Sequence, residues 1–140
     1  MTDVQRLLAR ASAWLVVIGL LTGALVAFAM TKKIPADDHA MLASHLNALL
    51  GAFLMLGVAW SMPMVRWSER GQRRIAIALI VANYGNWIIT LVKSFLHVHG
   101  VDAIGEAKND AVFAALMVFV IIPSLAATIA WAWGLTVKRK

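Results

Sequence analysis

The sequence predicts an all-α integral membrane protein that forms a four-helix bundle. Of its 140 residues, 61% are hydrophobic and 14% are charged, and the mean hydropathy is +0.78. A soluble domain carries about a quarter charged residues. Four apolar stretches, at roughly 7–31, 40–62, 75–97 and 110–136, each have the ~20 residues that a helix needs to cross a bilayer. We therefore expect residues 1–140 to form a single transmembrane domain.

The distribution of charge predicts the orientation of the helices. The net charge is +6, and in so apolar a chain basic loops beside a membrane explain this excess better than nucleic acid does, so no nucleic-acid partner is expected. Most of the basic residues lie at the two termini and in the loop after residue 62: Arg6, Arg10, Arg66, Arg70, Arg73, Arg74, Lys138, Arg139 and Lys140. The positive-inside rule then places both termini in the cytoplasm (N-in, C-in), in a multi-pass protein of the inner (cytoplasmic) membrane.

The first and fourth spans carry few polar side chains and are expected to serve packing. In the first span, Gly19 and Gly23 have the small-xxx-small spacing that lets two helices approach closely. Thr22 can donate a hydrogen bond to its own helix. This span is longer than the apolar region of a signal peptide, so we interpret it as a retained helix. In the fourth span, Pro123 predicts a kink.

The second span places a histidine and an asparagine, His45 and Asn47, one to two turns below its outer end. Neutral imidazole is the commonest metal ligand in proteins, although a lone histidine in a membrane helix is often a packing residue. Because neighbouring helices run in opposite directions, His45 should lie near the depth of Thr90 to Lys93 in the third span. Ligand, catalytic and packing roles are all compatible with this position.

The third span carries the one strongly polar face. Its polar side chains fall on one stripe of a helix: Asn83, Asn86, Thr90, Lys93 and His97. Such a stripe faces other helices or a polar cavity rather than lipid. Asn83 and Asn86 lie deepest, beside Tyr84 and Trp87, an arrangement that suits a pocket for a flat polar ligand. Hydrogen bonding between helices is the alternative interpretation.

Several chemistries are excluded or disfavoured by the composition. The absence of cysteine excludes disulfides, iron–sulfur clusters and c-type haem. The sequence has no Gly-rich phosphate loop, HExxH or GxSxG motif. No Asp or Glu falls clearly inside a span, which argues mildly against a proton-coupled exporter. The residues alone thus predict a small polar-lined pocket inside a membrane bundle.

Two segments, SHLNALLG at 44–51 and NYGNWIITL at 83–91, resemble hydroxylaminobenzene mutases, small four-helix membrane isomerases related to styrene oxide isomerase. The chain length, the number of helices and the ending Trp133-Gly134-Leu135 also fit, so the resemblance covers nearly the whole chain. The Tyr-x-Asn-Trp element points more to the mutase branch than to the epoxide branch.

The resemblance implies a cofactor, a reaction and an assembly. Styrene oxide isomerases are homotrimers that bind heme b in the membrane, and their axial histidine matches His45, which becomes the expected metal ligand. Asn83 and Thr90 are expected beside the cofactor. Mutases move the hydroxyl of an aryl hydroxylamine from nitrogen to a ring carbon and give an aminophenol. A small aromatic substrate, the lipid bilayer and two further copies of the chain are the expected partners.

Four residues are expected to act on the substrate. Asn86 and Asn47 would hold the departing oxygen, and Tyr84 and Trp87 would stabilise a cationic aromatic intermediate through their π-faces. Two departures from the epoxide branch favour the mutase reading. Gly51 stands where styrene oxide isomerases carry an asparagine, for which Asn47 could substitute, and their third-span tyrosine falls on Trp87, which cannot accept a hydrogen bond.

Three other interpretations remain open. The first is an isomerase that converts aryl epoxides to aldehydes by the same haem chemistry. The second is a haem electron carrier with His45 and His97 as paired axial ligands. The third is a transporter or a structural membrane protein without a cofactor.

Overall fold

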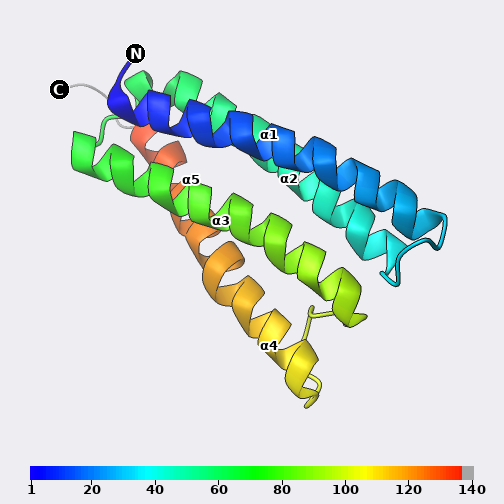
Figure 1. Cartoon of the computed structure of the whole chain (residues 1–140). Coiled ribbons are helices and arrows are strands. Elements are labelled where there is room, and N and C mark those ends of the chain that lie inside the picture. Colours follow the sequence, from blue (N-terminus) through cyan, green and yellow to red (C-terminus); the bar gives the residue numbers. More distant parts are fainter. Residues whose placement is uncertain (137–140) are drawn as a thin grey trace.

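The structure is a computed structural model that describes residues 1–136 (Figure 1), and the elements in this range are helical. In chain order they are α1 (Asp3–Met30), α2 (Asp38–Ser61), the 3-10 turn η1 (Met62–Met64), α3 (Glu69–Leu96), α4 (Ala107–Leu116), the π-helical turn η2 (Met117–Ile121) and α5 (Ile122–Thr136). They form four helices long and apolar enough to cross a membrane, the fourth built from α4, η2 and α5. The predicted all-α integral membrane fold is confirmed.

The helices begin earlier than their apolar stretches because polar residues cap them. Thr2 and Gln5 form a reciprocal capping box at the start of α1, and the Asp37 side chain accepts from the Ala40 amide at the start of α2. At α3 the Ser68 hydroxyl accepts from the Gly71 amide, so the helix starts at Glu69 rather than near residue 75. The first turns of α3 are therefore polar and lie outside the hydrophobic stretch.

The core lies between α1, α2 and the first half of α3. Leu8, Leu15, Met55 and Leu79 are fully buried there. Gly19 lies where α1 packs against α2, as the glycine spacing predicted. A Cβ added to Gly19 would lie 3.0 Å from the Ala48 Cβ and 2.9 Å from a methyl group of Leu49. A larger residue at position 19 would therefore push these two side chains of α2 away.

The fourth span packs on α3 and diverges from α1 and α2 along α4 (Figure 1), and it is the least buried of the four. Its far end is anchored by two indole groups: Trp67 Nε1 donates to the Ala130 carbonyl (2.7 Å) and Trp131 Nε1 donates to Ser61 Oγ (2.9 Å). A kink is predicted at Pro123, and the structure has a π-helical turn, η2, that ends two residues before this proline. Proline has no N–H for the carbonyl four residues earlier, so the helix departs from regular geometry there.

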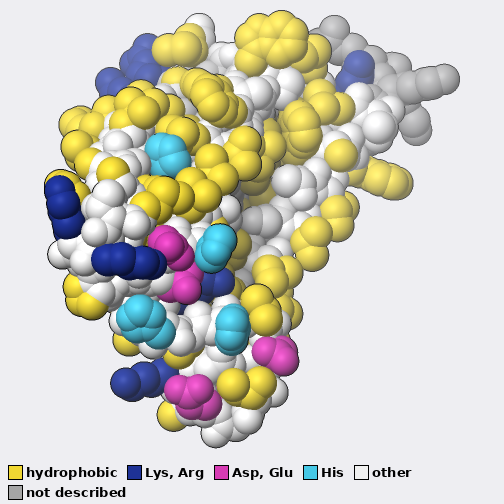
Figure 2. All heavy atoms as spheres, turned by 90° about the vertical axis from the view of Figure 1, so that its right-hand side faces the viewer, with side chains coloured by type: hydrophobic (Ala, Val, Ile, Leu, Met, Phe, Trp, Pro, Cys, Tyr) yellow, Lys and Arg dark blue, Asp and Glu magenta, His cyan; other side chains and the backbone are white. Residues whose placement is uncertain are grey.

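The two ends of the molecule differ in charge. The N-terminus, the end of α5 and the α2–α3 connection lie at one end (Figure 1), and this end carries Arg6, Arg66, Arg70 and Arg74. Figure 2 views the opposite end, where histidines gather with side chains of both charges around the α1–α2 and α3–α4 connections. This separation fits four antiparallel spans. That the arginine-rich end faces the cytoplasm stays a prediction.

Candidate functional site

A small polar cluster joins α2 to α3. Asn47 Nδ2 donates to Asn86 Oδ1 and to Thr90 Oγ1, both at 3.2 Å, and Thr90 Oγ1 lies 3.5 Å from Asn86 Oδ1. Thr90 is buried, whereas Asn47 and Asn86 are half-buried. The structure thus brings together three of the residues that the sequence singled out, from two different spans.

One group of this cluster is available to a ligand. Asn86 Oδ1 accepts from Asn47, but in residues 1–136 no hydrogen bond engages Asn86 Nδ2. No buried side-chain polar atom lacks a partner in the same range, so this amide is not sealed inside the protein. Asn47 and Thr90 hold Asn86 by its oxygen and leave its N–H groups as donors.

His45 lies against α1 rather than in this cluster. Its Nδ1 is 2.7 Å from the Gly19 carbonyl oxygen. Because a carbonyl only accepts, this contact requires a proton on Nδ1, and in the neutral imidazole Nε2 then keeps its lone pair. The ring rests on Gly23, where an added Cβ would lie 3.1 Å from the ring Cε1. Gly19 and Gly23 of α1 therefore orient the imidazole. From the sequence alone, these two glycines were expected only to let helices pack closely.

His45 and Asn47 use different faces of α2. Successive helical residues turn by about 100°, so positions 45 and 47 point about 200° apart. The hydrogen bonds agree, since His45 contacts α1 and Asn47 contacts α3. The sequence placed these two residues at the same pocket, but within one protomer the body of α2 separates them.

The aromatic side chains of α3 fasten it to α1. The Tyr84 hydroxyl donates to the Ala11 carbonyl (2.9 Å), and Trp87 Nε1 donates to Thr22 Oγ1 (3.0 Å). Trp87 also lines an apolar cleft of about 340 Å³ between α1 and α3. The other lining residues are Ile18, Leu21, Thr22, Leu25 and Leu91. With its N–H engaged, Trp87 offers this cleft an aromatic surface.

Asn83 lies against Gly51. Its Nδ2 donates to the Leu79 carbonyl (2.7 Å), and its Oδ1 lies 2.5 Å from where a Cβ on Gly51 would be. The side chain that fills the space beside Gly51 is thus Asn83 from α3, and Asn47 points elsewhere. Asn83 makes its hydrogen bond within its own helix.

Ser44 makes a hydrogen bond between α2 and α3 that was not predicted from the sequence. It is fully buried, and its hydroxyl donates to the Trp87 backbone carbonyl at 3.0 Å. Serine in a membrane helix usually bonds to its own backbone, so composition gave no reason to single it out. Its place at the start of the SHLNALLG segment was the available signal.

The remaining polar residues of the stripe lie at the end of α3. Lys93 Nζ donates to the His99 carbonyl (3.0 Å), and His97 is exposed at the helix end with φ 54°. No described contact joins His97 to His45. Within the part of the chain that the structure covers, no three His, Asp or Glu side chains gather into a metal site. A metal that needs only one protein ligand would be bound by His45.

A family model described as styrene oxide isomerase matches residues 4–136, which include all four spans. The comparison with curated proteins gives no match.

Proposed function

Because this chain belongs to the styrene oxide isomerase family, we propose that it is a membrane isomerase that rearranges an aryl hydroxylamine to an aminophenol. In this reaction the N–O bond breaks, a C–O bond forms at a ring carbon, the proton on that carbon is lost, and nitrogen gains a proton. No oxidant, reductant or second substrate is needed. The membrane isomerase assignment follows from the family, and the hydroxylamine substrate is our proposal.

The observation that carries the choice of substrate is the position of Trp87. Its N–H is engaged by Thr22, so the group that remains for a substrate is the aromatic face, at an apolar cleft of about 340 Å³. Breaking an N–O bond on an arylamine leaves positive charge on nitrogen and ring. An aromatic face stabilises such a cation, and the Trp87 N–H, engaged by Thr22, is not free to donate to an epoxide oxygen.

The residues of the chain fit haem as the cofactor. The Gly19 carbonyl fixes the His45 proton on Nδ1 and leaves Nε2 for iron, which is the usual arrangement of a metal-ligating histidine. We propose that His45 holds heme b through Nε2, with Asn83 and Thr90 supporting the helix packing behind it. When bound, ferric haem supplies a Lewis acid that makes the substrate oxygen a better leaving group.

We propose that the side-chain amide of Asn86 donates a hydrogen bond to the substrate oxygen as the N–O bond breaks. Asn47 and Thr90 hold its Oδ1, so its Nδ2 is oriented before substrate arrives. A preoriented donor stabilises an oxygen on which negative charge develops without reorganising in the reaction. Tyr84 contributes by fixing α3 against α1, which keeps Trp87 in place. Exclusion of water by the bilayer limits capture of the cation by solvent.

We propose that the working unit is a homotrimer. Within one protomer the His45 imidazole contacts α1, the Asn86 amide contacts α2, and the Trp87 N–H contacts Thr22 of α1. No hydrogen bond in residues 1–136 joins these three side chains to one another, and a neighbouring copy can bring further side chains to them. The thinly packed fourth span leaves apolar surface for such a contact in the membrane.

Product analysis with the purified, haem-loaded protein tests the proposal. Phenylhydroxylamine should give aminophenol, and this product should carry no label when the reaction is run in ¹⁸O-water. Formation of an aldehyde from styrene oxide, with phenylhydroxylamine unchanged, would instead assign the second candidate, epoxide isomerisation, which the family description favours. Activity toward neither substrate would contradict both.

A further inference from the structure

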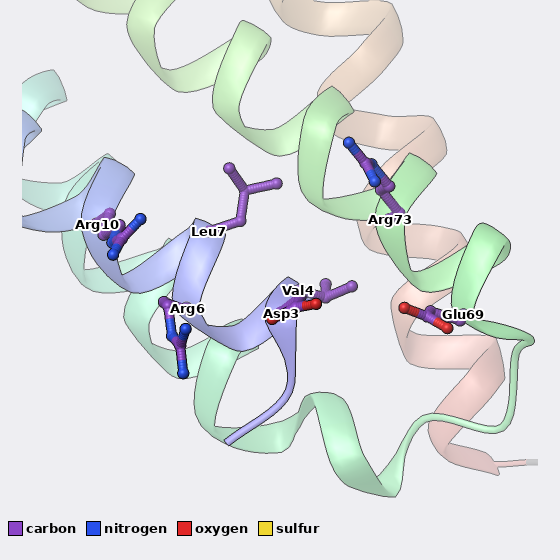
Figure 3. Close-up of a pocket in the computed structure, with 7 residues that line it drawn as sticks. All are labelled: Asp3, Val4, Arg6, Leu7, Arg10, Glu69 and Arg73. Atoms are coloured by element: carbon purple, nitrogen blue, oxygen red, sulfur yellow. The ribbon is translucent and has the colours of Figure 1, made fainter.

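A cleft unrelated to the proposed reaction lies between the first turns of α1 and α3, at the end that carries the N-terminus (Figure 3). Its volume is about 310 Å³. The residues that line it are Asp3, Val4, Arg6, Leu7, Arg10, Glu69 and Arg73. It is thus formed by three guanidinium groups, two carboxylates and two apolar side chains.

The charged groups of the cleft do not neutralise one another directly. In residues 1–136 the one ion pair within 4.0 Å is Lys32–Asp38, at the opposite end of the molecule. Figure 3 shows Arg6 and Arg10 on α1 and Arg73 on α3. The guanidinium and carboxylate groups of the cleft are therefore available to a ligand that carries one positive and one negative charge.

The apolar residues of the cleft set its depth in the membrane. Val4 is buried, Leu7 is 37% exposed, and in Figure 3 both project from α1 toward α3. They mark the first apolar turn of a span whose outer residues are charged. A cleft at this position lies where lipid headgroups meet the hydrocarbon core, and basic pockets between spans recognise headgroup phosphates.

We propose that this cleft binds the headgroup of phosphatidylethanolamine. Guanidinium groups match phosphate oxygens in geometry and charge, so Arg73, on α3, would receive the phosphate. Arg6 and Arg10, on the side of α1 away from α3, would add positive potential at the cleft. The primary ammonium has three N–H donors for acceptors such as the carboxylates of Asp3 and Glu69. Phosphatidylcholine carries no N–H on its nitrogen, and phosphatidylglycerol carries no cation. The mixed lining therefore selects against both.

Native mass spectrometry of the detergent-purified protein tests this selectivity, with the three lipids supplied at equal concentration and with identical acyl chains. Phosphatidylethanolamine should be retained preferentially. Equal or stronger retention of phosphatidylglycerol or phosphatidylcholine would overturn the proposal. Displacement of the lipid by soluble phosphoethanolamine at the same concentration would also overturn it, because the ligand would then be the free headgroup.

Paired variants assign the binding to this cleft. Arg73→Gln should weaken retention of both phosphatidylethanolamine and phosphatidylglycerol by about tenfold to a hundredfold, the effect of losing a charged hydrogen bond. Arg74→Gln, the adjacent exposed arginine outside the cleft, is the matched control and should change neither. Glu69→Gln should weaken phosphatidylethanolamine alone. Equal effects of Arg73→Gln and Arg74→Gln would exclude this cleft.

Discussion

The imidazole of His45 is oriented entirely by small residues of α1. Gly19 provides a carbonyl acceptor at 2.7 Å, and Gly23 provides the space in which the ring lies. Neither contribution comes from a side chain, so neither is visible in a search for polar residues. The histidine is nevertheless held in the one tautomer that leaves Nε2 as a metal ligand.

His45→Ala should abolish haem binding, because it removes the proposed iron ligand. The measurement is the Soret absorbance per protomer of the purified protein before and after dithionite. Gly23→Ala should lower haem affinity by about tenfold, since displacing a ligand from its supporting shell has effects of that size. His39→Ala, an exposed histidine in the first turn of α2, is the control. A His45→Ala protein that keeps its full haem content would rule out the proposed ligand.

Asn86→Ala should lower turnover of phenylhydroxylamine by about a hundredfold, the effect of losing one preoriented donor. Haem content should not change, because Asn86 hydrogen-bonds to α2 and not to His45. Asn47→Ala should have a smaller effect, since Asn47 only positions Asn86. Steady-state kinetics at matched haem content make the comparison, and an unchanged rate for Asn86→Ala would assign it to packing.

At the scale of the elements, α2 and α3 meet where Asn83 fits against Gly51. Gly51→Ala should destabilise the protein by about 1–3 kcal/mol, because the new methyl group would overlap the Asn83 amide. Gly57→Ala on the same helix has open space and should be neutral or stabilising by up to about 1 kcal/mol. Thermal unfolding in detergent compares the two.

A second substitution tests the cause of that difference. Asn83→Ala in the Gly51→Ala background should recover most of the lost stability, since it removes the overlapping atoms. If the double variant is as unstable as the sum of the single ones, the two positions are independent and the contact does not set the helix spacing.

The sequence was sufficient to predict the helices and the polar stripe but not the rotation of one helix against another. Hydropathy located all four spans, and offsets along α3 placed Asn86 and Thr90 on one face, where both bond to Asn47. The face that His45 occupies depends on how α2 turns toward Gly19 and Gly23. This rotation follows from packing between spans distant in the chain, which periodicity within one span does not encode.

At the scale of the whole molecule, the basic residues predict which end lies in the cytoplasm. The chain has no cysteine, so single-cysteine variants can be labelled without background. Val101→Cys, on the exposed α3–α4 connection, should react with a membrane-impermeant maleimide in intact cells. Thr2→Cys should react only after the cells are lysed, because the N-terminal end is expected in the cytoplasm. The reverse pattern would invert the assigned topology.

The contacts of His45 form between spans that are synthesised earlier than the span that carries Asn86 and Trp87. Membrane spans enter the bilayer as helices and then associate, and N-terminal segments emerge first. Both partners of the His45–Gly19 bond belong to the first two spans, whereas Asn86 and Trp87 arrive with the third. A ribosome that has released only the first hairpin has therefore already delivered an oriented imidazole to the bilayer. During biogenesis, capture of the proposed haem can therefore precede assembly of the proposed substrate-binding surfaces.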